Sequence, residues 1–324
     1  MTRSTPPLEI IDFHTHLWPP AWGTGGRYAR AGHGFAPDIH RKINTPRSLV
    51  DEFSAAGVSR AVVTATIESL FGAEGPVDLS AVREANDWLA TLSNDHPSLI
   101  GFAVTDAFSG EAGAIEAERA IGELGLSGLV IDSSRTGKFL ADPAVRPTLE
   151  VAARYRVPVF VHPVAHPDSQ VLIEGAGMFG NSLGRGLMNG VAFLSIIQTS
   201  LLDELPDLHL VFATLGLGAI VQAARGGIYA RQERAAARRP NIYFDTMGHD
   251  PAIIATLTGF FGADRVVAGT DWPILSALSQ ESLGASLEQA GLSDDEARLV
   301  AGGNAARLLN LRQGKGLAAA AGRA

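Results

Sequence analysis

The chain has 324 residues, with 26 Lys or Arg and 34 Asp or Glu, so its formal net charge is −8. Apolar residues make up 46% and charged residues 19%, a balance that supplies a large core and excludes a disordered chain. The absence of Cys excludes disulfides, a Cys nucleophile and thiolate metal sites, so any bound metal needs His, Asp or Glu ligands. The acidic balance gives no support for nucleic-acid binding, which needs clustered cations.

Neither a signal peptide nor a membrane helix is expected. Met1–Pro7 leads straight into an apolar run and lacks the apolar core of a signal peptide. The nearest candidate for a membrane span, Gly186–Leu202, is uncharged but is interrupted by polar residues. Because a span needs ~20 predominantly apolar residues, a buried helix is the better interpretation of this stretch. The cytoplasm is the expected location.

Eight short runs rich in Val, Ile, Phe and Ala predict β-strands. Continuous apolar runs of this kind are typical of strands that are covered on both faces, as in a parallel sheet. The runs are Leu8–Leu17, Ser59–Thr66, Leu99–Asp106, Ser127–Asp132, Pro158–Pro163, Leu208–Leu215, Ile242–Thr246 and Arg265–Asp271. Helical patterns separate them.

Three helix starts are marked by a capping residue. Thr45 is placed as N-cap before Pro46, Asp78 precedes a pattern of apolar residues at helical spacing, and Asp142 precedes Pro143 in a helix that runs to about Tyr155. Ala219–Ala237 also has a helical pattern.

Eight strands, each followed by helical material, predict a (β/α)₈ barrel, with a doubly wound sheet as the competing arrangement. We expect one barrel domain over residues 1–312 and a flexible low-complexity tail over residues 313–324. Residues 18–44 form a long loop after the first strand, and a structureless loop of that length is usually functional or disordered.

The strongest chemical signal is Asp12-Phe13-His14-Thr15-His16 at the end of the first strand. Residues two apart in a strand point to the same side, so His14 and His16 can chelate one metal through their imidazole nitrogens. The C-terminal ends of barrel strands are where active sites lie. An isolated His-x-His pair carries little weight, and its position after the first strand is what gives it significance.

Two further metal-binding side chains end later strands. His162 closes the fifth strand and Asp271 the eighth, which neighbours the first in a closed barrel. Taken singly, His162 is equally well a hydrogen-bonded histidine and Asp271 a turn or capping residue. Together with His14 and His16 they place four ligand-type groups at one rim.

These motifs resemble the amidohydrolase superfamily, and within it the branch of aminocarboxymuconate-semialdehyde decarboxylase. The resemblance covers nearly the whole chain and rests on Asp12–His16, Phe160–Pro163, Tyr243–Asp245, Gly269–Pro273 and Gly303–Leu309. It implies one divalent metal held by His14, His16, His162 and Asp271. Zinc is the expected ion, with manganese and iron as alternatives, because such ligand sets accept all three.

The resemblance fails at the end of the sixth strand, where relatives place a His that orients or deprotonates metal-bound water. Here Thr214 stands at that place, and a Thr hydroxyl is no practical base near neutral pH. Either Asp271 handles the proton alone, or His166 or His249 replaces the missing His, or the chemistry differs. Asp271, Thr214 and His249 are therefore the catalytic candidates.

A single metal is expected. Binuclear relatives commonly bridge two metals with a carboxylated Lys from the fourth strand, but the chain's lysines are Lys42, Lys138 and Lys315, none of them in that strand. A second metal would need carboxylates such as Asp132 or Asp245.

Other polar and aromatic residues carry weaker predictions. Relatives hold a substrate carboxylate with a cation near the first loop, which makes Arg41 and Arg47 the candidates for substrate binding. Two tryptophans, Trp18 and Trp272, are expected either to line the pocket or to pack in the core. Glu68 is expected either to face the pocket or to cap the next segment. The apolar segment Met178–Leu187 forms either a substrate wall or part of a subunit interface, and a homodimer is expected by analogy with this branch.

The leading hypothesis is a metal-dependent enzyme that hydrolyses or non-oxidatively decarboxylates a small, carboxylated organic molecule. The metal would act as a Lewis acid. A non-haem iron oxygenase or hydroxylase on the same scaffold is the alternative, since a His/Asp site without Cys also suits iron. A degenerate, non-catalytic barrel is the third hypothesis, and four convergent ligands argue against it.

Overall fold

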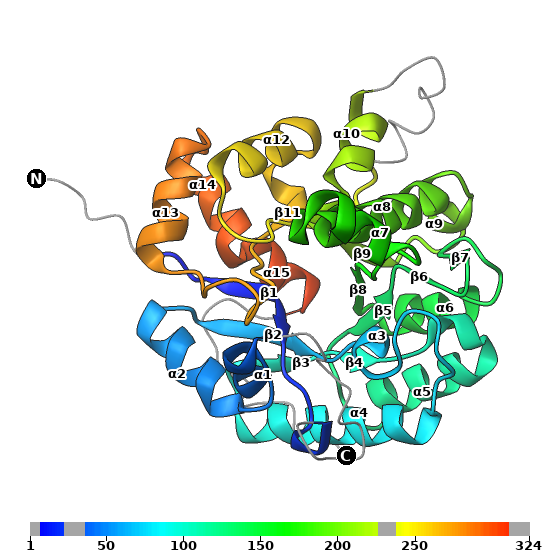
Figure 1. Cartoon of the computed structure of the whole chain (residues 1–324). Coiled ribbons are helices and arrows are strands. Elements are labelled where there is room, and N and C mark those ends of the chain that lie inside the picture. Colours follow the sequence, from blue (N-terminus) through cyan, green and yellow to red (C-terminus); the bar gives the residue numbers. More distant parts are fainter. Residues whose placement is uncertain (1–6, 23–35, 226–237, 311–324) are drawn as a thin grey trace, which may run out of the picture.

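The strands form a closed parallel barrel with the helices outside it, in a computed structural model that describes residues 7–22, 36–225 and 238–310 (Figure 1). The barrel strands are β1 (Ile11–His16), β2 (Arg60–Thr64), β3 (Leu99–Gly101), β4 (Ala103–Val104), β5 (Leu129–Asp132), β8 (Pro158–His162), β9 (His209–Phe212), β10 (Ile242–Asp245) and β11 (Val266–Val267). All eight predicted runs contain strand.

Hydrogen bonds join the two parts of the sheet into a ring. Strands β1 to β3 form one part, and β4, β5 and β8 to β11 form the other. The third predicted run carries both β3 and β4, which are interrupted only at Phe102. On the other side, Phe13 N–H donates to Ala268 O and Asp271 N–H donates to His14 O, so the eighth run closes against the first. The predicted barrel is confirmed and the doubly wound alternative is wrong.

The helices surround this ring (Figure 1). They are α1 (Pro37–Ile43), α2 (Pro46–Ala56), α3 (Ile67–Phe71), α4 (Leu79–Asp95), α5 (Glu111–Gly122), α6 (Arg146–Tyr155), α7 (Ser169–Ala176), α8 (Met178–Ile197), α9 (Leu201–Glu204), α10 (Leu217–Arg225), α12 (Pro251–Phe261), α13 (Gln280–Gln289), α14 (Asp294–Arg298) and α15 (Asn304–Leu308). A short hairpin of β6 (Ser134–Arg135) and β7 (Lys138–Phe139) follows β5. In the described part of the chain, no helix has the length and apolar character needed to cross a bilayer.

Two of the three predicted helix starts are confirmed. Thr45 and Asp78 are the N-caps of α2 and α4. The start predicted at Asp142 is wrong, because Asp142 instead closes a turn in which its side chain accepts from Ala144 N–H. The helix begins four residues later, at Arg146, with a second proline in its first turn.

The segments predicted as irregular or uncertain are partly regular. Residues 18–44 include a 3₁₀ turn at Pro20–Trp22 and the helix α1, so the prediction of a structureless loop is wrong there. Residues 23–35, the second half of the predicted helix Ala219–Ala237 and the tail 313–324 lie outside the described residues. A single domain over 1–312 stays a prediction.

Two layers of apolar side chains build the core. One fills the barrel and includes Phe13, Phe102 and Phe160, with Phe13 and Phe102 in an edge-to-face contact at 5.4 Å between ring centroids. The other lies between the strands and the surrounding helices. Each buried Phe contributes about 1.5–3 kcal/mol relative to an exposed one, so the filled interior is a rigid base for the upper rim.

The closing segment Gly303–Leu309 fastens the last helix to the base of the eighth strand. Asn304 is fully buried, and its side-chain amide donates to Ala263 O at 2.8 Å and to Val266 O at 2.7 Å. One carbonyl belongs to β11 and the other lies just before it, and β11 is the strand that precedes Asp271.

We expect Asn304→Ala to lower the free energy of unfolding by about 1–3 kcal/mol, because it removes two buried hydrogen bonds to main-chain carbonyls. Chemical denaturation followed by circular dichroism measures this. Asn94→Ala, on the exposed face of α4, is the matched control and should change stability by about 0.5 kcal/mol or less. Equal effects of the two substitutions would contradict the role given to Asn304.

Candidate metal centre

The two histidines of β1 reach the barrel interior through an irregularity in that strand. The pairing of β1 with β2 shifts register between Asp12 and Thr15. A β-bulge of this kind re-aims side chains, and here both Phe13 and His14 contact the ring of Phe160 inside the barrel. His16 follows two residues later on the same side as His14, as predicted, with 5.2 Å between the two ring centroids.

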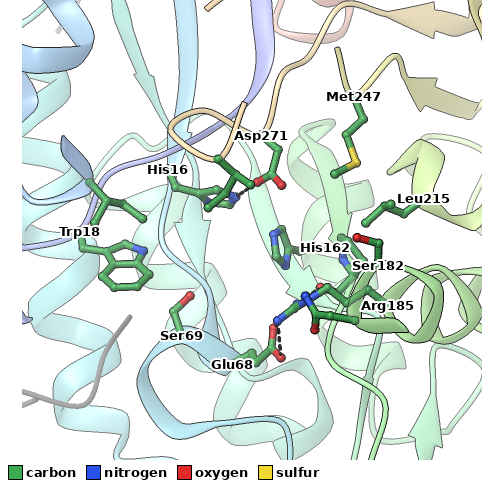
Figure 2. Close-up of a pocket in the computed structure, with 14 residues that line it drawn as sticks. His16, Trp18, Glu68, Ser69, His162, Ser182, Arg185, Leu215, Met247 and Asp271 are labelled. Carbon is green, nitrogen blue, oxygen red and sulfur yellow. Dashed lines mark hydrogen bonds and ion pairs between the residues drawn. The ribbon is translucent and has the colours of Figure 1, made fainter. Parts of the chain in front are cut away.

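His162 and Asp271 complete a compact cluster with this pair. Each of the four side chains offers one ligand atom, and all four atoms lie within 4.8 Å of one another. Asp271 Oδ1 lies 3.1 Å from His16 Nε2 and 3.4 Å from His14 Nε2. Figure 2 shows His16, His162 and Asp271 turned toward a common space.

Asp12 fixes the segment that carries Asp271. Its carboxylate accepts from Thr270 N–H at 3.0 Å, from the Thr270 hydroxyl at 2.6 Å and from His14 N–H at 3.0 Å. Burial raises the pKa of Asp12 to about 7 despite these bonds. Asp271 then adopts a left-handed backbone conformation with φ of 66°, which Asp tolerates better than most residues. This turn directs its carboxylate to the histidines.

His14 is oriented by Asp245, at the end of β10. The two side chains form a hydrogen bond of 2.6 Å between His14 Nδ1 and Asp245 Oδ2. Since a carboxylate only accepts, Nδ1 carries a proton, so Nε2 is the ring nitrogen that can bind a metal when the imidazole is neutral. Nε2 is buried and has no hydrogen-bond partner among the described residues. Gly269 permits this arrangement, because a Cβ there would lie 3.0 Å from His14 Cβ and 3.2 Å from Asp245 Cβ.

The charge states of the cluster suit a divalent cation. Burial and the neighbouring His16 and His14 hold the pKa of His162 well below its usual range, so its imidazole is neutral. Burial alone raises the pKa of Asp271, but the charges of His14 and His16 and the His16 hydrogen bond outweigh it and lower that pKa. Three imidazole nitrogens and one carboxylate fit a divalent metal.

The cluster opens on a pocket of about 740 Å³, with the space at its mouth included. Its described lining is His16, Trp18, Ile43, Glu68, Ser69, His162, Pro163, Asn181, Ser182, Arg185, Leu215, Met247, Asp271 and Ile274. The metal-ligand candidates lie on one side and a Glu68–Arg185 ion pair on another (Figure 2).

A family model described as "Amidohydrolase" matches residues 11–311 of this sequence. The chain belongs to the amidohydrolase family. The match includes both first-strand histidines and the closing helix, and it confirms the family inferred from the motifs.

The relatives of this amidohydrolase include decarboxylases. This chain is 26% identical over 337 residues to 2-amino-3-carboxymuconate-6-semialdehyde decarboxylase of Dictyostelium discoideum, and the match covers 94% of this chain and 92% of the relative. It is 26% identical over 255 residues to a gamma-resorcylate decarboxylase of a Polaromonas species, covering 71% and 76%.

Solved structures show the same fold. A dihydroxybenzoic acid decarboxylase from a Polaromonas species, with bound manganese and the inhibitor 2-nitroresorcinol, has a TM-score of 0.78 at 20% identity and covers 96% of this chain and 99% of its own. The 5-carboxyvanillate decarboxylase of Sphingomonas paucimobilis has a TM-score of 0.76 at 21% identity, with 94% and 100% covered.

Thr214 of this amidohydrolase contacts Asp245 and is not among the described residues that line the pocket. Its N–H donates to Asp245 Oδ1 at 2.9 Å and its hydroxyl donates to the Asp245 main-chain carbonyl. The hydroxyl is thus already engaged. Thr214 positions the carboxylate behind His14, so the structure gives it no contact with a reacting group.

The two histidines weighed as replacements lie away from the cluster. His249 is exposed after β10, and Met247 lines the pocket in its place. His166 is half-buried and accepts a hydrogen bond from Asp168 N–H at 3.0 Å. His166 lines an adjoining cavity instead. Neither histidine reaches the pocket lining.

The predicted substrate-binding arginines lie on the surface. Arg41 pairs with Asp38 at 2.5 Å, and Arg47, whose side chain is 84% exposed, pairs with Asp51 at 3.4 Å. Both belong to sequence-local pairs in or beside α1 and α2, and neither lines the pocket in the described residues. The cation that does so is Arg185 of α8, which sequence reasoning missed because nothing in its helical context marks it.

The remaining candidates separate into lining and supporting residues. Trp18 lines the pocket, whereas Trp272 is buried and donates to Glu52 at 2.9 Å. The Asp245 carboxylate is hydrogen-bonded to His14. Asp132 is buried, and burial together with the Glu68 charge raises its pKa well above its ordinary value. No second metal cluster occurs among the described residues.

We expect Asp245→Asn to weaken metal binding about 10–100-fold. The carbonyl oxygen of the introduced amide still accepts from Thr214 N–H, so its NH₂ group faces His14 Nδ1 and forces the ring proton onto Nε2, where the metal would bind. Competition with a chromophoric chelator measures the affinity of the metal-free protein for Mn²⁺ and Zn²⁺. Asp207→Asn, an exposed change, is the control, and equal affinities in the two variants would contradict the role of Asp245.

Proposed function

We propose that this amidohydrolase is a metal-dependent carboxy-lyase that removes a carboxylate group, as CO₂, from a small carboxylated aromatic molecule. The observation that carries the proposal is the cluster of His14, His16, His162 and Asp271 at the inner end of a pocket that also has an apolar wall. The named relatives and structural neighbours are decarboxylases, which supports the reaction type.

The metal is proposed to be held by these four side chains. When bound, a divalent ion supplies a Lewis acid that binds and polarises anionic oxygens. The chain's own contribution is to fix the ligands: Asp245 sets the tautomer of His14, and the Asp12–Thr270 hydrogen bonds hold the turn that bears Asp271.

The pocket walls orient the substrate. Trp18, Ile43, Leu215, Met247 and Ile274 form an apolar lining that suits an aromatic ring. Figure 2 shows Trp18 on one side of the pocket and Leu215 and Met247 on the opposite side. A flat ring between these walls would direct its carboxylate to the metal end.

Asp271 is the group placed to move the proton. In the overall reaction the bond between the ring carbon and the carboxylate carbon breaks, CO₂ leaves, and one proton taken up from water joins the ring carbon. Asp271 lines the pocket and turns Oδ1 to the two histidines, so its carboxyl can carry that proton to carbon.

Decarboxylation is proposed over hydrolysis because the named relatives are decarboxylases. Thr214 is engaged with Asp245, and His249 and His166 lie away from the cluster, so Asp271 is the one group of the described lining that we place to transfer a proton in either reaction. No observation favours the oxygenase hypothesis, and the assembled ligand cluster argues against a degenerate barrel.

Metal identity, assembly and location belong to the same proposal. Zinc is the ion expected from the sequence, and structural neighbours with manganese make that ion an equal candidate.

Exposed apolar side chains on α8, such as Phe179 at 85% exposure and Leu183, support a subunit interface on this helix, because its polar residues Ser182 and Arg185 line the pocket instead. A cytoplasmic location stays a prediction.

Elemental analysis of protein purified without added metal should find about one zinc or manganese per chain. Removal of the ion with a chelator should abolish CO₂ release from carboxylated phenols, and the ion should restore it. Iron near two per chain with O₂ consumption would instead support the oxygenase, and a protein that retains no metal after reconstitution would overturn the site.

Asp271→Asn should lower kcat by about 10²–10⁴-fold, the range of a lost acid–base group. CO₂ release under saturating substrate measures kcat, and metal analysis of the same sample checks that the ion is retained. Near-normal turnover in a metal-loaded variant would remove Asp271 from the mechanism.

A further inference from the structure

An ion pair between Glu68 and Arg185 closes the far end of the pocket. Glu68 lies in α3, just after β2, and Arg185 lies in α8. The guanidinium donates through Nη1 to Glu68 Oε2 at 2.7 Å and through Nη2 to Oε1 at 3.1 Å. Such a two-bond pairing is strong and geometrically fixed.

Main-chain groups of one loop hold both partners in place. Arg185 Nη1 also donates to Pro163 O at 2.9 Å, and Glu68 Oε1 accepts from Ala165 N–H at 2.8 Å. This loop follows His162, a metal-ligand candidate. The Arg185 and Glu68 side chains are 26% and 12% exposed, so the pair is largely removed from water.

The pair also separates the pocket from a second cavity. The adjoining cavity, between the turn after α3 and the loop after β8, shares four lining residues with the pocket: Trp18, Glu68, Ser69 and Arg185. In Figure 2 the pair spans the end of the pocket away from Asp271 and His16. A substituent of the substrate that points away from the metal centre therefore meets this pair.

The charge at this end is balanced before any substrate arrives. Arg185 is the only Lys or Arg among the described residues that line the pocket, and Glu68 is the only carboxylate there besides Asp271. A second anionic group on the substrate has two ways to bind here. It would either displace Glu68 from its two hydrogen bonds with Arg185, or lie beside the negative charge of Glu68 with no cation of its own. Both are unfavourable in a site largely removed from water. Neutral polar groups meet no such cost, since Ser69, Ser182 and Asn181 offer hydrogen bonds nearby.

We propose that the Glu68–Arg185 pair selects the substrate by charge: it admits aromatic monocarboxylates whose other substituents are neutral and rejects those with a second anionic group remote from the metal. This inference rests on the proposed function and narrows its substrate class. The selecting element is Glu68, because it neutralises the one cation that would otherwise attract a second carboxylate.

Two unreactive probes that differ in one charge test the proposal. In 4-hydroxy-3-nitrobenzamide and 4-hydroxy-3-nitrobenzoate the nitro group stands for the carboxylate that would be lost, and the remote group is a neutral amide or an anion of nearly the same shape. Calorimetry on the manganese-loaded protein should give the amide at least tenfold tighter binding than the acid. Glu68→Gln keeps the size of the side chain and should increase the affinity for the acid. The ratio of the amide affinity to the acid affinity should therefore fall at least tenfold.

Glu150→Gln is the matched control. It removes the same charge from an exposed pair, with Arg146 at 2.7 Å on α6, and should leave the ratio unchanged. If Glu68→Gln does not fold or loses its metal, Arg185→Gln is tested instead. This variant should bind 4-hydroxy-3-nitrobenzoate more weakly than the parent chain does. Its affinity for the amide should stay within about threefold of that of the parent chain.

The outcomes separate this inference from the function on which it depends. Equal binding of the two probes to the parent chain, or an unchanged ratio in Glu68→Gln, would overturn the role of the pair while leaving the carboxy-lyase proposal intact. Failure of both probes to bind the metal-loaded parent chain would overturn the carboxy-lyase proposal and this inference with it.

Discussion

The closure of the barrel between its first and last strands is the constraint on which the site depends. Asp271 N–H donates to His14 O, and Asp12 binds Thr270 through both carboxylate oxygens, so the turn after β11 is fixed against the very strand that carries the two histidines. Without this closure Asp271 and the histidines would be separated by most of the chain. With it, a cluster with metal-ligand chemistry forms from two strands, β1 and β8, and a turn that hydrogen bonds fix to β1.

Two carboxylates, Asp245 behind His14 and Glu68 in the pocket lining, act through the side chain that each one binds. Asp245 accepts a hydrogen bond from His14 Nδ1–H and so leaves Nε2 as the nitrogen that can bind a metal, and Glu68 pairs with the guanidinium of Arg185. In both cases a buried charge is paired with a hydrogen-bonding partner, which limits its desolvation cost. In both cases the pairing decides what the neighbouring space can bind: a cation beside His14, and no second anion beside Arg185.

The parts that the sequence could predict are those with a periodic or positional signal. Apolar runs of strand length predicted every barrel strand, and strand ends gave His162 and Asp271 because parallel strands end at one rim. The β-bulge at Phe13 and His14 has no such signal, since it is seen only in the pairing with β2. Arg185 and Glu68 are 117 positions apart, and only the folding of α8 over the pocket brings them together. Arg41 and Arg47 lie outside the described pocket lining, and each pairs with an acidic residue three or four positions away at the surface.

Thr214 shows how a departure from a family pattern can be structural and chemical at once. A histidine there would present a base to the metal side of the pocket, whereas Thr214 uses both its N–H and its hydroxyl on Asp245 and so stabilises the partner of His14. The exchange removes a group that activates water and strengthens one that orients a ligand. The site keeps the metal-ligand cluster and the one proton carrier, Asp271, that loss of CO₂ requires, so this departure from the family pattern leaves the proposed reaction in place.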